Sequence, residues 1–254
     1  MRLFAISDLH TDFKENRLVV ESLPDDTFKQ DALIVAGDVA DRLEVIEYTL
    51  ALLRSKFRHV FYVPGNHELW VRGEAYDSME KLRRILEMCR RINVETNPVK
   101  IDGLWVVPLL SWYESGFDSD DDRHVEELEG WADFYFCKWP ADVTDVCRNF
   151  LDANEANIRP PDGPVISFSH FLPRRDLLPP REYLRFKSLP KVSGCARLDE
   201  QIRRLKSITH VFGHSHINID RVIDGVRYVN NALLYPRERT AARFPLKMIW
   251  SDAD

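Results

Sequence analysis

Short apolar runs alternate with amphipathic stretches over the first third of the chain. Leu3–Ile6, Ala32–Ala36 and Arg58–Val63 are apolar runs of the length of buried strands. Between and after these runs, Leu43–Arg54 and Tyr76–Arg91 repeat apolar residues at spacings of three and four, which predicts helices with one buried face. Strands that alternate with helices predict parallel βαβ units with short loops at the strand ends.

Hairpins and further buried strands follow in the rest of the chain. Asp102-Gly103 and Asp224-Gly225 each stand between two β-type runs, which is a strong hairpin signal. The other predicted elements are strands at Val165–Phe168 and His210–Phe212, and helices at about Asp142–Ala156 and Leu198–Lys206. We find no internal repeat and no flexible linker, so the pattern predicts one α/β domain with two sheets over residues 1–254.

Two long segments, residues 111–140 and 171–191, interrupt this pattern. The first is acidic and aromatic, whereas the second is basic and rich in proline. Loops of this length in a compact domain are usually functional or disordered, and the aromatic content of the first argues against simple disorder. We therefore expect lids or specificity loops at both places.

Each of these segments has two interpretations that the sequence leaves open. The basic side chains after position 171 either meet an anionic substrate or pair with the acidic stretch "SDDD"; they are Arg174, Arg175, Arg181, Arg185 and Lys187. The aromatic side chains of the first segment form either a wall for a flat ligand group or, as we favour, a satellite core; they are Trp112, Tyr113, Trp131, Phe134, Tyr135 and Trp139.

Composition and charge narrow the class of protein. A formal charge of -6 does not favour a nucleic-acid partner, although a local basic groove would be compatible with it. The cysteines show no CxxC or zinc-knuckle spacing, which indicates reduced thiols; they are Cys89, Cys137, Cys147 and Cys195. No apolar stretch approaches the roughly 18 residues of a membrane span. We expect a soluble cytoplasmic protein, and nothing in the pattern indicates its oligomeric state.

Residues able to bind a metal follow five of the predicted strands. They are Asp8 and His10; Asp38 and Asp41; Asn66, His67 and Glu68; His170; and His214 and His216. In open α/β sheets the ligand site lies beyond the carboxyl ends of the strands, so these side chains are expected to meet. Oxygen and imidazole donors without thiolate favour manganese, iron, zinc or nickel. The number of donors suggests two ions. The remaining histidines, His59, His124 and His210, fall outside this pattern.

The ordered series DxH, GDxxDR, GNHE, a later single histidine and GHxH resembles the signature of the calcineurin-like metallophosphoesterases. Here it stands as Asp8-His10, Gly37 to Arg42, Gly65 to Glu68, His170, and Gly213 to His216. The resemblance spans Asp8 to His216 and implies the two-sheet αββα sandwich of that superfamily. The two long loops carry none of it.

The resemblance also implies a role for each matched position. Asp8, His10 and His216 would hold a first metal, Asp38 would bridge, and Asn66, His170 and His214 would hold a second. We expect manganese, with iron, zinc, nickel or a mixed iron-containing pair as alternatives. A hydroxide bridging the two ions would attack phosphorus, and His67 would protonate the leaving oxygen as general acid.

Asp41 and Arg42 are further candidates for the catalytic machinery. "GDVADR" resembles the GDxxDRG of the serine/threonine phosphatases, where the Asp orients the catalytic His and the Arg contacts phosphate. Leu43 departs from that pattern, where those enzymes have glycine. Asp41 followed by Glu44 is also a capping-box pattern for the next helix, and this alternative stays open.

Three functional classes are consistent with these residues. The leading one is a metal-dependent phosphomonoesterase or phosphodiesterase that acts on a small phosphorylated molecule. The second is a nuclease of the same superfamily, against which the acidic balance counts. The third is a non-catalytic scaffold that keeps the fold. A scaffold should show eroded ligand positions, and none of the matched positions is eroded.

Overall fold

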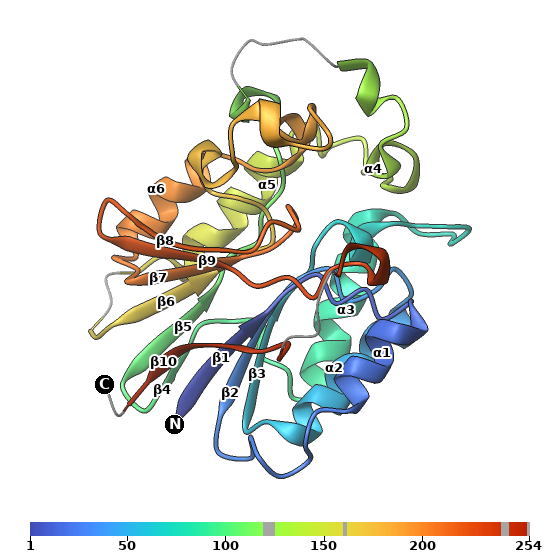
Figure 1. Cartoon of the computed structure of the whole chain (residues 1–254). Coiled ribbons are helices and arrows are strands. Elements are labelled where there is room, and N and C mark those ends of the chain that lie inside the picture. The colour runs from blue at the N-terminus through green and yellow to red at the C-terminus, as the bar shows by residue number, and fades with distance from the viewer. Residues whose placement is uncertain (119–124, 160–161, 240–243, 253–254) are drawn as a thin grey trace.

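Two β-sheets pack face to face in the computed structural model, which describes residues 1–118, 125–159, 162–239 and 244–252 (Figure 1). The first sheet has the strand order β10-β1-β2-β3, and the second has the order β4-β5-β6-β7-β9-β8. The strands are β1 (Arg2–Ile6), β2 (Ala32–Ala36), β3 (His59–Val63), β4 (Val99–Ile101), β5 (Leu104–Pro108), β6 (Val165–Phe168), β7 (Thr209–Phe212), β8 (Ile219–Ile223), β9 (Val226–Asn230) and β10 (Lys247–Ser251).

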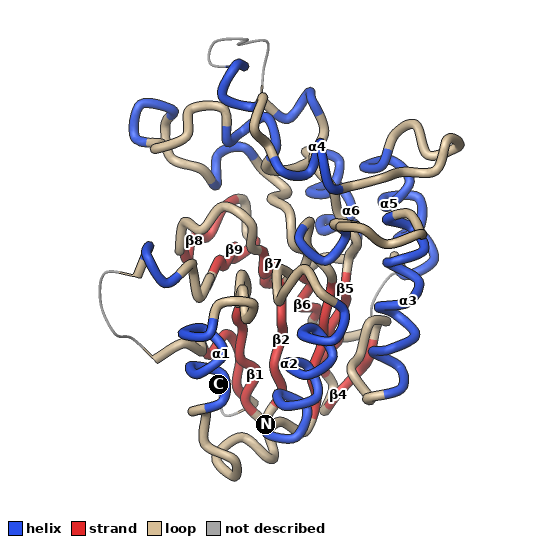
Figure 2. The backbone as a smooth tube through the Cα atoms, turned by 90° about the vertical axis from the view of Figure 1, so that its right-hand side faces the viewer, coloured by secondary structure: helices blue, strands red, loops and turns tan. Residues whose placement is uncertain are grey.

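Helices cover the outer face of each sheet. The α-helices are α1 (Lys14–Glu21), α2 (Leu43–Lys56), α3 (Ser78–Arg91), α4 (Ala132–Phe136), α5 (Val146–Asn154) and α6 (Arg197–Arg204). Helices α1 to α3 lie against the first sheet, α5 and α6 lie against the second, and α4 stands apart over one end of the sandwich (Figures 1 and 2). This is the predicted αββα arrangement, which the structure confirms.

Strand β2 shows how the core is built. All five of its residues are buried. Leu33 and Val35 pack in the layer under the helices, whereas Ile34 points into the layer between the sheets. Side chains of successive strand residues point to opposite faces, so a strand covered on both faces must be apolar throughout. Each such buried side chain stabilises the fold by about 1.5–3 kcal/mol relative to its exposed form.

The parallel pairing of the central strands brings their carboxyl ends together. Strand β2 pairs in parallel with both β1 and β3, and β6 and β7 pair in parallel in the second sheet.

The predicted strands, hairpins and longer helices all occur, with ends that differ by a few residues. Helix α1, strand β10 and the short helix α4 were not predicted. In α1 only Asn16 and Val20 are buried, which is too weak an apolar stripe to recognise.

The two long segments pack on one another and form a cap beyond this end of the sheets, where they can be followed by colour at the top of the molecule (Figure 1). Trp131 of the first stacks on Phe186 of the second, with ring centroids 5.7 Å apart and planes at 5°. The Arg181 guanidinium pairs with the Asp118 carboxylate at 2.5 Å. Residues 119–124, which contain "SDDD" and His124, lie outside the described residues.

Within the part of the chain that the structure describes, no helix is both long and apolar enough to cross a membrane.

Candidate metal centre and active site

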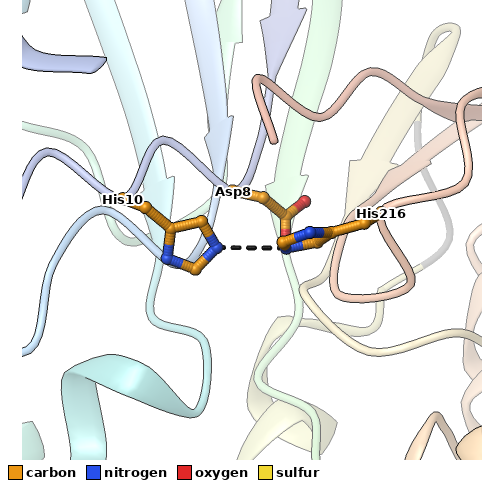
Figure 3. A group of neighbouring side chains, drawn as sticks. All are labelled: Asp8, His10 and His216. Atoms are coloured by element: carbon orange, nitrogen blue, oxygen red, sulfur yellow. Dashed lines mark hydrogen bonds and ion pairs between the residues drawn. The ribbon is translucent and has the colours of Figure 1, made fainter. Parts of the chain in front are cut away.

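Asp8, His10 and His216 form the first of two groups at the strand ends (Figure 3). Asp8 and His10 follow β1, whereas His216 follows β7 in the other sheet. The Nε2 atoms of His10 and His216 lie 3.0 Å apart, and His216 Nε2 lies 3.4 Å from Asp8 Oδ1. Asp8 and His10 are at most 1% exposed, so their donor atoms converge on one shielded point.

The second group contains Asp38, Asn66, His170 and His214. His170 Nε2 lies 3.4 Å from Asp38 Oδ1 and 3.2 Å from Asn66 Oδ1. The same amide oxygen of Asn66 lies 3.1 Å from His214 Nδ1. Asp38 also belongs to a cluster with His10 and His67, so it stands between the two groups. The structure thus brings together all seven side chains that the sequence predicted as donors.

The backbone around these donors is bent in a way that ordinary loops avoid. Asp8, His10, Asp38, His214 and His216 all have positive φ, between 44° and 68°. This left-handed conformation costs about 1–2 kcal/mol for a residue with a side chain, and such residues gather at functional sites.

Electrostatics show what kind of group fits this place. Burial, followed by the neighbouring charges of Glu68 and Asp8, raises the pKa of Asp38 well above its usual value of 3.8. Buried carboxylates this close to one another need positive charge to remain ionised. Divalent cations carry that charge, and carboxylate, amide and imidazole donors suit them. The residues present therefore fit a metal centre.

Hydrogen bonds behind the donors set their orientation. His170 Nδ1 donates to the Ala36 carbonyl oxygen at 2.9 Å, which leaves the Nε2 lone pair directed at the site. His216 Nδ1 lies 2.7 Å from the Glu238 carboxylate and is held in the same way. Because a carbonyl or carboxylate only accepts, the partner identifies the protonated ring nitrogen.

Glu68 holds the two central loops together. It is fully buried, and its carboxylate accepts from the backbone N–H groups of Asp38 at 3.1 Å and Gly65 at 2.7 Å. Glu68 thereby joins the loop after β2 to the loop after β3.

His67 lies at the wall of a cavity of about 500 Å³ that opens beside the first group. The walls also include His10, Trp70, Arg72, Tyr235 and Arg237. The His67 ring packs on Trp70 with centroids 3.7 Å apart, and its Nε2 atom lies 3.3 Å from the Tyr235 hydroxyl. The Tyr235 ring in turn stacks on His10.

Asp41 and Arg42 lie near the site without touching His67 in any described hydrogen bond. The Asp41 carboxylate lines the cavity and pairs with Arg72 at 3.2 Å. Arg42 is the residue before helix α2, and its side chain makes no cap hydrogen bond. The alternative capping box between Asp41 and Glu44 is therefore not formed, because the cap position falls on Arg42 instead.

The aromatic residues of the cap divide between core and site. Trp112 is buried in the core beside α5, with Tyr113 and Trp139 packed against it, which agrees with the satellite-core interpretation. The ring centroids of Trp131 and His214 lie 6.1 Å apart, so Trp131 is next to the candidate metal donors. Phe134 and Tyr135 are exposed and belong to neither group.

The basic residues of 171–191 are largely engaged with carboxylates of the chain itself. Arg174 pairs with Asp176 at 2.7 Å, and Arg175 lies 3.5 Å from Asp118. None of the five basic residues is among the described residues that line the cavity beside His67. The pairing with "SDDD" falls outside the described residues. These contacts indicate that the basic residues of this segment stabilise the cap.

Sequence reasoning missed several residues at the predicted site, and three of them hydrogen-bond its residues directly. Glu238 and Tyr235 come from the loop after β9, and Asp133 comes from α4. None belongs to a motif. The only local signal was the aromatic character of the segment around Asp133, which predicted an ordered loop without indicating where it packs.

A two-sheet α/β sandwich whose strand ends gather carboxylate, amide and imidazole donors defines a class, the metal-dependent hydrolases of phosphate esters. The sequence profile of the calcineurin-like phosphoesterases matches residues 1–218, and the chain belongs to this family. This confirms the resemblance, the expectation of an enzyme and the reaction type. The family implies a centre of two divalent metal ions.

The relatives found include one enzyme that aligns with nearly the whole chain. The acyl-carrier-protein phosphodiesterase PptH of Mycobacterium tuberculosis is 31% identical, over 93% of this chain and 78% of that protein. The crystal structure of phosphopantetheinyl hydrolase PptH from the same organism matches with a TM-score of 0.83 at 28% identity, over 99% of this chain and 96% of that one. Another solved structure, 16% identical over 91% and 90% of the two chains with a TM-score of 0.51, shows the fold alone.

Proposed function

We propose that this enzyme hydrolyses the phosphodiester that joins a phosphopantetheine group to an acyl carrier protein. The observation that carries the proposal is the likeness to PptH, which extends over 99% of this chain and thus includes the cap as well as the strand ends. The sequence suggested a free small molecule as substrate. A protein-borne ester is our more specific proposal for the same phosphoester chemistry.

We assign Asp8, His10 and His216 to a first metal and Asn66, His170 and His214 to a second, with Asp38 between them. Two divalent cations bound there would neutralise phosphate oxygens and lower the pKa of the attacking water. Manganese is the metal we propose first, with iron, zinc and nickel as alternatives.

His67 is the proposed proton donor to the leaving oxygen. Its imidazole lies at the cavity wall, 3.9 Å from Asp38 Oδ2, so it faces both the metal groups and the substrate space. Burial lowers the pKa of His67 well below 6.5, and the negative charge of a bound phosphate ester opposes that shift. The Tyr235 hydroxyl, 3.3 Å from Nε2, positions the ring.

Asp41 and Arg42 are proposed only as supporting residues. Asp41 holds Arg72 at the wall of the cavity, and Arg42 lines a neighbouring pocket with Arg72.

The cavity volume of about 500 Å³ falls within the usual range of small-ligand sites, so it has room for the organic part of an ester. We also propose a cytoplasmic location, since the four cysteines are unpaired thiols.

Mass spectrometry of an acyl carrier protein tests the substrate. Metal-loaded enzyme is incubated with a phosphopantetheinylated carrier protein, and the intact mass is followed over time beside a His67→Ala control and the small diester bis-p-nitrophenyl phosphate. We expect the carrier protein to lose its phosphopantetheine group with the wild-type enzyme and to keep it with His67→Ala. Turnover of the small diester with an unchanged carrier protein would rule out the proposed substrate while leaving the enzyme class intact.

A further inference from the structure

Asp133 is a cap residue whose carboxylate reaches the interior of the metal site. It lies in α4 and is 3% exposed, although its neighbours Phe134 and Tyr135 are 56% and 64% exposed. Its Oδ1 atom accepts from Asn66 Nδ2 at 2.8 Å. A buried acidic side chain in a short surface helix is uncommon, because burial of a charge costs free energy unless the charge is fully hydrogen-bonded.

Two tryptophans also donate hydrogen bonds to this carboxylate. Trp70 Nε1 donates to Oδ1 at 2.6 Å, and Trp131 Nε1 donates to Oδ2 at 2.8 Å. With Asn66 as the third donor, both carboxylate oxygens are occupied. Asp133 therefore has a fixed position, from which it can direct the side chain of Asn66.

The contact with Asp133 decides which end of the Asn66 amide faces the site. A carboxylate accepts but does not donate, so Asn66 must turn its NH₂ group toward Asp133. The amide oxygen then points the opposite way, where it lies 3.2 Å from His170 Nε2 and 3.1 Å from His214 Nδ1. A flipped amide would present an NH₂ group there, which is not a metal ligand.

We propose that Asp133 is a positioning residue that makes Asn66 Oδ1 a ligand of the second metal, and that the cap thereby takes part in building the metal centre. The inference rests on the metal assignment proposed above. The carboxylate needs no contact with metal or substrate to act, since it works through the orientation of one amide.

Further contacts connect α4 to the loop that carries the site. The Val71 N–H donates to the Phe136 carbonyl at 2.7 Å, and the Ser78 N–H donates to the Lys138 carbonyl at 2.8 Å. Trp70, one donor to Asp133, is also the residue on which the His67 ring packs. A shift of α4 would therefore move Asn66 and the support of His67 together.

Metal binding tests the inference independently of substrate turnover. Asp133→Leu removes both acceptors and keeps the branched shape of the side chain, and we expect the affinity for the second ion to fall about 10–100-fold, as for other residues that orient ligands. Asp133→Asn can keep one acceptor toward Asn66 and should retain most of the affinity. Metal per chain is measured by elemental analysis after dialysis against graded Mn²⁺, and coupling between the two ions is followed by electron paramagnetic resonance.

Tyr135→Phe is the matched control, because it removes a hydrogen bond to the Glu129 carbonyl from the same helix outside the site. It should keep two ions with unchanged affinity. If Asp133→Leu lowers the melting temperature but keeps both ions at wild-type affinity, its role is structural and the inference is wrong. A wild type that binds fewer than two ions would overturn the metal assignment as well. Two ions with an inert carrier protein would contradict only the proposed substrate.

Discussion

Gly65 stands where a β-carbon has no room. A β-carbon at this position would lie 2.7 Å from His170 Nε2 and would overlap the Asp38 carboxylate. Glycine is therefore required for the loop after β3 to pass beneath the second donor group. The sequence indicated glycines next to the donors, and the structure supplies the reason for this one.

Gly65→Ala should displace the second donor group and leave the first largely in place. We expect the metal content to fall from two ions per chain toward one and phosphodiesterase activity to be lost, measured by elemental analysis and by hydrolysis of bis-p-nitrophenyl phosphate. Gly116→Ala is the control, because a β-carbon there meets no atom within 4 Å. Two tightly bound ions in Gly65→Ala would contradict this reading.

His210 is a core histidine that is predicted to make the fold sensitive to acid. Its ring nitrogens lie 2.8 Å from Ser167 Oγ and 3.0 Å from Ser169 Oγ, and burial lowers its pKa from 6.5 to about 3. As the pH falls below about 6.5, the unfolded chain takes up a proton at this histidine while the folded chain does not. The free energy of unfolding therefore decreases as the pH is lowered through that range.

His210→Gln should remove this dependence. Between pH 7.5 and 5.5 the wild type should lose about 1.4 kcal/mol more unfolding free energy than the variant, measured by urea titration at constant metal. The other histidines are the same in both proteins, so their contribution cancels. If the unfolding free energies of the two proteins change in parallel with pH, His210 is not the source of the acid sensitivity and the prediction is wrong.

At the scale of elements, the cap is held together by contacts between two segments far apart in the chain. Trp131 stacks on Phe186, and Asp118 pairs with Arg175 and Arg181. The sequence indicated that both segments were more than linkers, because one was aromatic and the other basic. Their packing on each other was not predictable, since it depends on where β5 and β6 place the two loops.

Phe186→Ala should loosen the cap without unfolding the sandwich. We expect faster amide hydrogen exchange in 125–140 and 171–191 by mass spectrometry, because the aromatic stack that joins the segments is lost. Exchange in β1 and β2 should not change. Tyr183→Ala, at a side chain in the same cap that is 76% exposed, should leave the whole pattern as in the wild type. Unchanged exchange in Phe186→Ala would mean that other contacts hold the cap.

At the scale of the whole molecule, the proposed metal centre draws its donor residues from both sheets. Asp8 and His10 follow strand β1 of the first sheet, whereas His170 follows β6 and His216 follows β7 of the second sheet. Bound ions would thus join the two halves of the sandwich. Buried carboxylates such as Asp38 lack compensating charge when the ions are removed.

Chelation should therefore lower thermal stability in a metal-dependent way. A metal ion at a hundred times its dissociation constant stabilises the fold by about 2.7 kcal/mol, which corresponds to roughly 5–10 °C for a chain of this size. Melting temperature is measured by differential scanning calorimetry against Mn²⁺ concentration after chelator treatment. An Asp38→Asn variant should respond less steeply. A melting temperature independent of Mn²⁺ in the wild type would contradict the proposed centre.

The sequence by itself determined the fold class and every proposed metal donor. Both depend on local features: the alternation of apolar runs with amphipathic helices, and the residue types that directly follow each strand. The tertiary structure alone decided how the donors are oriented. Asn66 and Asp133 are 67 positions apart and His67 and Tyr235 are 168 apart, so no local pattern connects them. Folding brings these side chains into contact, and their hydrogen bonds determine which atoms face the site.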